Sequence, residues 1–114
     1  MRLRSDIWVS AYLRRCGVEG VDAVLRARGA AEAGAILVKV DRLDGTADVY
    51  GLAPQSAYEA EPDERLFVRL GDASPVDQAA AERLIGREQR FDTDLWIVEI
   101  EDRAGRSFLD LARL

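Results

Sequence analysis

Residues 91–106, FDTDLWIVEIEDRAGR, contain the clearest strand pattern of the chain. Trp96, Val98 and Ile100 alternate with a second set of side chains, so the two sets should face opposite sides of a sheet. That second set is Leu95, Ile97, Glu99 and Glu101. Both sets begin apolar and one becomes acidic, which is typical of an interior strand whose far end leaves the core.

The N-terminal half predicts a helix followed by three strands. The helix should span about 5–16, because apolar side chains recur there at helical spacing, with Ser5 as its N-cap and Gly17 just beyond its end. A weakly patterned strand is expected over 21–28. Residues 35–50 predict a hairpin with an Asp-Gly pair at its turn.

The C-terminal half predicts a loop over 52–64 and a strand over 65–70. A helix over about 75–89 should follow, with Ser74 as its N-cap. Its expected buried stripe is Val76, Ala80, Leu84 and Ile85. After the strand described above, the chain should return as a short strand within 106–114.

The predicted order is therefore α-β-β-β-β-α-β-β, which defines an α+β fold. The simplest packing is a largely antiparallel sheet of about five or six strands covered by two helices. We expect one domain over 1–114, since a chain of this length suffices for one core. The expected core is Trp96, Val98, Ile100, Ile36, Val38, Leu66 and Val68, packed with Leu13 and Leu84.

Three blocks of the sequence resemble those of a known family. They are DIWVSAYLRRC (6–16), GAILVKVDRLDGTADVYG (34–51) and FDTDLWIVEIEDRAGRSFLD (91–110). Together they resemble a bacterial family of about this length, catalogued as domain of unknown function 1491. The resemblance covers nearly the whole chain apart from 52–64. It implies no catalytic residues that could be transferred.

The composition argues against several classes of protein. The net charge of −5 disfavours nucleic acid and anionic lipid at long range. There is no histidine and only one cysteine, so common nucleophile-base pairs and thiolate metal cages are missing. No phosphate-binding glycine motif, signal-peptide pattern or membrane-spanning apolar run occurs. We expect a cytoplasmic protein without a cofactor.

The acids of residues 99–102 are the main candidates for chemistry. Glu99 and Glu101 lie two apart on a strand, so they share a face at roughly 7 Å spacing. With Asp102 nearby, they would suit acid-base catalysis or a hard divalent cation. The favoured alternative is a solvated strand end whose acids pair with Arg103, Arg106 or an arginine of a neighbouring strand.

Four further features of the sequence can be interpreted structurally or functionally. Asp92 and Asp94 fit an Asx turn between helix and strand. Cys16 is expected to be a buried structural thiol rather than a reactive one. Trp8, Tyr12 and Trp96 are expected to form a core aromatic cluster, with a partner-binding pocket as the alternative. The basic residues of the N-terminus, which would form a patch only if they shared a face, are Arg2, Arg4, Arg14 and Arg15.

The leading functional hypothesis is a non-enzymatic interaction or regulatory domain. Its partner would be another protein or a second copy, bound at a sheet edge or at the second side of the first helix. The alternatives are a carboxylate-based enzyme or cation-binding protein using Glu99, Glu101 and Asp102, and a weak nucleic-acid binder using the N-terminal arginines. The sequence leaves open whether the protein is an enzyme.

Overall fold

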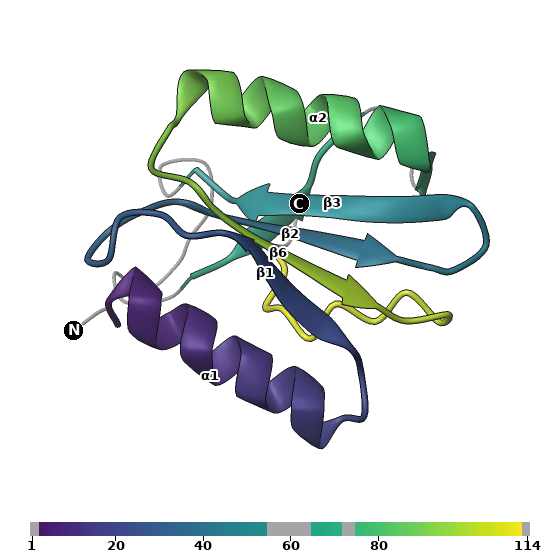
Figure 1. The fold of residues 1–114 in the computed structure, drawn as a ribbon, viewed down its shortest axis with the longest axis horizontal. Coiled ribbons are helices and arrows are strands. Elements are labelled where there is room, and N and C mark those ends of the chain that lie inside the picture. The colour runs from purple at the N-terminus through teal and green to yellow at the C-terminus, as the bar shows by residue number, and fades with distance from the viewer. Residues whose placement is uncertain (1–2, 55–64, 72–74, 113–114) are drawn as a thin grey trace.

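The computed structural model describes residues 3–54, 65–71 and 75–112. Its elements confirm the predicted α+β class, with a two-residue strand added before the second helix (Figure 1). In chain order they are α1 (Ser5–Val18), β1 (Ala23–Ala27), β2 (Ile36–Asp41), β3 (Thr46–Leu52), β4 (Phe67–Arg69), β5 (Val76–Asp77), α2 (Gln78–Phe91) and β6 (Trp96–Glu101).

The sheet has the strand order β1-β6-β2-β3-β4, and β5 pairs with β3. β6 is the interior strand that its sequence predicts. It runs parallel to β2, with Trp96 opposite Ile36 and Glu101 opposite Asp41, and antiparallel to β1. The remaining pairs are antiparallel. A parallel pair needs a crossover connection, and α2 forms part of it.

The two helices cover opposite faces of this sheet (Figure 1). Trp96, Val98 and Ile100 belong to the core cluster that includes α1. Leu95 and Ile97 belong to the cluster that includes α2. The alternation read from residues 95–100 is thus confirmed. Neither helix of the described chain is long and apolar enough to cross a bilayer.

The strand β1 contains an irregularity that no local sequence pattern predicts. Its register against β6 shifts between Leu25 and Ala27, which leaves Arg26 as an extra residue. A β-bulge of this kind puts two successive side chains on the same face and reverses the alternation beyond it. Ala27 accordingly packs with the α2 cluster, although Leu25 packs with the α1 cluster.

The predicted ends of α1 need correction. Arg4, not Ser5, occupies the N-cap position, and no side chain caps the helix there. Ser5 is buried, and its hydroxyl donates to the Gly34 carbonyl at 2.7 Å, so it fixes the helix to a distant loop instead. At the other end, the helix continues past Gly17, and Gly20 provides the left-handed residue with φ of 75°.

The start of α2 also differs from the prediction. Asp77 is the N-cap, and its carboxylate accepts a hydrogen bond from the Ala80 backbone N–H at 2.7 Å. The two residues before the helix are held in β5, which delays the helical turn; Ser74 lies outside the described residues. Ala81 and Ile85 are its buried positions, and Leu84 packs in the α2 cluster rather than beside Trp96.

β4 buries the face opposite to the predicted one. Phe67 is completely buried in the α1 cluster, whereas Leu66 and Val68 are half-buried. The large ring fills the space beside α1 and decides which face turns inward. Of the predicted loop over 52–64, residues 55–64 lie outside the described chain.

The C-terminal residues form a cover instead of the expected strand. A single bridge joins Leu111 to Phe67, and Phe108 and Leu109 pack against the α1 cluster. The Tyr12 hydroxyl donates to the Ser107 carbonyl at 2.6 Å. Part of the wide apolar surface of α1 is therefore covered within the same chain.

Candidate functional site

The three acids at the end of β6 occupy different settings. The Glu99 carboxylate accepts from the Arg26 guanidinium at 3.0 Å, and Glu101 is exposed. Asp102 accepts from the backbone and side chain of Arg106, and these hydrogen bonds lower the pKa of its carboxyl. Among the described residues, no group of three acids, cysteines or histidines could hold a metal ion. The predicted arginine pairing is present for Glu99 and Asp102, but only Glu101 is exposed, and Asp102 is buried rather than solvated.

Glu99 belongs to an ionic network that sequence reasoning missed. Lys39, the only lysine, is 4% exposed, and its ammonium lies 2.8 Å from the Glu82 carboxylate and 3.7 Å from that of Glu99. Arg26 binds both carboxylates, at 2.8 Å and 3.0 Å. The Arg26 hydrogen bond is the largest effect that lowers the pKa of Glu82 to about 2. The network joins α2 to β1, β2 and β6, and its role is to fix the helix to the sheet.

A second buried carboxylate lies on the α1 side of the sheet. Asp48 is 1% exposed, and Arg42 binds it at 2.8 Å. Arg69 lies 3.5 Å from the other oxygen and also donates to the Tyr50 hydroxyl at 3.0 Å. A buried charge needs such partners, so this cluster is a structural one.

Asp92 and Cys16 have the predicted structural roles. The Asp92 carboxylate accepts from the Asp94 backbone N–H at 2.9 Å, which is an Asx turn. Cys16 lies on the buried face of α1, and burial is the main effect that raises the pKa of its thiol. A raised pKa disfavours the reactive thiolate.

The aromatic cluster has a different third member from the predicted one. Trp8 stacks on Tyr12 with ring centroids 5.1 Å apart and lies 5.3 Å from Phe67. Trp96 belongs to the same core but stands apart from these rings, and its indole N–H donates to the Ala30 carbonyl at 2.7 Å.

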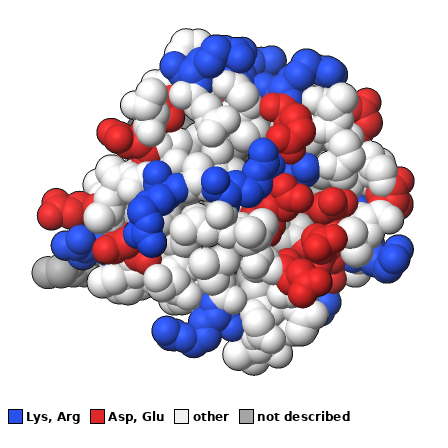
Figure 2. Space-filling model, viewed as in Figure 1, with Lys and Arg blue, Asp and Glu red and all other residues white. Residues whose placement is uncertain are grey.

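The basic N-terminal residues do not act as one patch. Arg4 pairs with Asp6 at 3.2 Å, Arg15 lies over the Phe108 ring, and Arg14 borders a groove described below. Arg2 lies outside the described residues. Figure 2 shows a row of basic side chains along the edge formed by α2 and a group of acidic ones to the right, with both signs interspersed elsewhere on this face.

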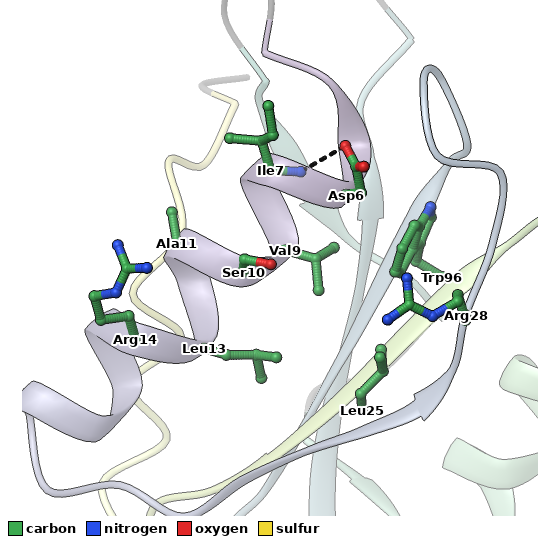
Figure 3. Close-up of a pocket in the computed structure, with 10 residues that line it drawn as sticks. All are labelled: Asp6, Ile7, Val9, Ser10, Ala11, Leu13, Arg14, Leu25, Arg28 and Trp96. Carbon is green, nitrogen blue, oxygen red and sulfur yellow. Dashed lines mark hydrogen bonds between the residues drawn. The ribbon is translucent and has the colours of Figure 1, made fainter.

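A groove between α1 and the adjoining edge of the sheet is the strongest candidate site (Figure 3). It encloses about 380 Å³, which is within the size range of ligand-binding clefts. One wall is the first three turns of α1, and the other comes from β1, the residue after it and β6. Its lining is Asp6, Ile7, Val9, Ser10, Ala11, Leu13, Arg14, Leu25, Arg28 and Trp96.

The β1 bulge places Arg28 in this groove. Leu25 faces α1, and on a regular strand a side chain three positions further along would face the opposite side, toward α2. The extra residue reverses the order, and the Arg28 guanidinium instead lies over the Trp96 ring, 5.3 Å from its centroid. Bulges often re-aim a side chain at a functional site in this way.

The groove combines an apolar floor with the cationic side chain of Arg28. Val9, Leu13 and Leu25 pack with Trp96 in the core cluster beneath it. Figure 3 shows the Arg28 guanidinium beside Trp96 on the sheet side, whereas the Arg14 side chain leaves α1 on its far side and is directed away from Arg28.

The groove has one carboxylate of its own, and that carboxylate is already engaged. Asp6 is bound by Arg4 and by the Ile7 backbone N–H. Within residues 3–54, 65–71 and 75–112, no ion pair involves Arg14 or Arg28. The site is suited to an apolar group that carries a negative charge.

Comparison with known proteins identifies the family. A family model described as "Protein of unknown function (DUF1491)" matches residues 3–110. The chain belongs to the DUF1491 family. The resemblance read from the three sequence blocks is thereby confirmed.

Solved structures similar to this DUF1491 protein share its fold. A crystal structure of a DUF1491 family protein from Caulobacter crescentus CB15 is 38% identical, with a TM-score of 0.76 over 96% of this chain and 94% of that one. A solution structure of a protein from A. tumefaciens is 39% identical, with a TM-score of 0.79 over 97% and 95%. No curated protein matches the chain.

Proposed function

We propose that this DUF1491 protein is a non-enzymatic interaction module, and that the groove between α1 and β1 is its contact surface. The observation that carries the proposal is the pairing of an apolar floor with Arg28. Interaction sites combine apolar contacts with a few charged groups that select the partner. The cytoplasm is the proposed compartment, because a single thiol suits a reducing environment.

A different protein is a better partner for this groove than a second copy. A two-fold contact uses the same patch on both chains. It would bring the Arg28 side chains of both copies to the same contact, and like charges at a contact oppose association. The C-terminal cover over α1 also reduces the apolar surface that a homodimer would need to bury.

Site-specific photocrosslinking in native cells tests the proposal. A benzoylphenylalanine placed at Ser10, in the groove, should yield a crosslinked protein, and one at Val18 should not. Val18 is a matched control because it lies on the same helix and is 81% exposed. Reversing the groove charge with Arg28→Glu should abolish the Ser10 product. Equal products at both positions, or none at Ser10, would contradict the proposal.

A further inference from the structure

We infer that the groove receives an extended segment of another protein, which adds a strand to the outer edge of β1 and directs an acidic side chain to Arg28. This inference rests on the proposed interaction function and specifies its partner. It combines two features that lie side by side: an open strand edge and a cationic, apolar groove.

The outer edge of β1 has backbone groups available for pairing. The Asp22 carbonyl accepts from the Glu101 N–H at 3.0 Å, so it points toward β6. Backbone groups alternate along an antiparallel strand, and those of Val24 therefore also point to β6. The N–H and C=O groups of Ala23 and Leu25 point the other way. In the described part of the chain, no hydrogen bond from another segment reaches them.

The opposite edge of the sheet is closed by the chain itself. On β4, the Phe67 N–H donates to the Asp110 carbonyl at 2.8 Å, and the Ala112 N–H donates to the Phe67 carbonyl at 2.9 Å. Proteins commonly cover an edge in this manner to prevent unwanted pairing. β1 has no such cover among the described residues. It also presents Val24 with 56% of its surface exposed.

The position of the groove determines which side chains an added strand should carry. A residue opposite Leu25 would project toward α1, where Leu13 and Trp96 form the floor. A carboxylate two positions along the same face would lie toward Arg28, beyond the bulge. An extended segment with an apolar and an acidic residue at alternate positions satisfies both sites.

An extended segment fits better than a helix because a helix satisfies its own backbone groups. A docked helix could offer only side chains to the outward backbone N–H and C=O groups of Ala23 and Leu25. Strand addition provides main-chain hydrogen bonds for affinity and uses the groove for specificity.

Fluorescence anisotropy with a defined peptide tests the inference. The probe is a fluorescein-labelled Thr-Leu-Thr-Glu-Thr amide, whose Leu and Glu share one face when it is extended. Binding should weaken about tenfold when Gln replaces Glu, a loss in the range of one charge-assisted contact. Two further probes carry N-methyl groups on the backbone nitrogens of one edge of the extended peptide, a different edge in each probe. Only the probe methylated on the edge that faces β1 should lose binding.

Matched variants of β1 test the strand edge directly. Ala23→Pro removes an outward N–H and leaves the β6 ladder and the groove side chains in place, since proline is tolerated where an edge N–H faces solvent. It should weaken probe binding about tenfold, whereas Ala23→Ser should bind as the wild type does. The ¹H–¹⁵N spectrum of each variant checks that the fold is kept.

The outcomes separate this inference from the proposed function. If the probe binds but neither N-methylation nor Ala23→Pro matters, strand addition is wrong and the groove remains the contact surface. If the Gln probe binds equally, the acidic requirement is wrong. If light scattering shows a concentration-dependent dimer that the probe does not dissociate, a second copy occupies the edge and the inference fails. Failure of the Ser10 crosslink would instead overturn the function itself.

Discussion

The guanidinium of Arg28 lies over the indole ring of Trp96, with its central carbon 5.3 Å from the ring centroid. The two residues come from different strands, and only the extra residue in β1 brings them to the same face. Cation–π contacts at exposed sites contribute about 0.5–1 kcal/mol. One structural irregularity therefore determines both a small stabilising contact and the charge of the groove.

Arg28→Ala should accordingly reduce the free energy of unfolding by about 0.5–1 kcal/mol. Denaturant unfolding measures the change. Arg103→Ala is the control, since Arg103 is exposed and lies in the turn after β6. Equal effects of the two substitutions would show that the contact with Trp96 contributes nothing.

Val98→Ala should be far more costly, because Val98 is completely buried in the centre of β6. We expect a loss of about 1–3 kcal/mol through reduced burial and the cavity left behind. Val24→Ala, at an exposed position of β1, should change stability by less than about 0.5 kcal/mol. A loss at Val98 below a few tenths of a kcal/mol would be incompatible with its place in the core.

The success and failure of sequence reasoning can be traced to particular residues. Trp96, Val98 and Ile100 were correctly assigned to one face because alternation is a local property of a strand. Leu66 and Val68 were assigned to the core because the alternate face carries Arg65 and Arg69. The packing of Phe67 against Trp8, which no local pattern contains, turns that alternate face inward.

The candidate site depends on long-range pairing, which local patterns do not contain. Arg28 reaches the groove only because β1 pairs with β6 out of regular register. Lys39 and Glu82 are 43 positions apart, and their contact follows from the crossover of α2 over the sheet. A lone lysine inside an apolar strand, ILVKVD, was the signal that could have pointed to a buried ion pair.

Glu82 should make stability depend on pH in the acidic range. Its pKa is lowered from 4.5 to about 2 in the folded protein. A group with a depressed folded-state pKa stabilises the fold fully above its ordinary value, and the contribution is lost as the pH falls through the folded value. The free energy of unfolding should therefore fall between pH 4.5 and about 2. Glu82→Gln should flatten this part of the curve.

Millimolar calcium, magnesium or manganese should not raise the melting temperature, because Glu99 and Asp102 are bound by arginine and lysine side chains and leave Glu101 alone as a ligand. Replacing Glu99 and Glu101 together by Gln should cost about 1 kcal/mol or less, the range of partly exposed ion pairs. A ligand that binds the folded state raises its melting temperature. A rise in the wild type that the double variant lacks would establish a cation site.

Lys39 should resist acylation in the folded protein. Its ammonium is 2.8 Å from Glu82, and the residue is 4% exposed, so a reagent reaches it only when α2 moves away from the sheet. The Arg103→Lys variant supplies an exposed amine in the same molecule as an internal reference.

Peptide mapping by mass spectrometry after brief acetylation compares the two amines. We expect modification at position 103 to be at least about tenfold faster under native conditions, because local opening governs access to buried groups. The two rates should become similar in denaturant. Glu82→Gln removes the closest partner of Lys39 and should speed its modification without changing that at 103. Similar native rates at both positions would mean that the ionic network does not hold α2 against the sheet.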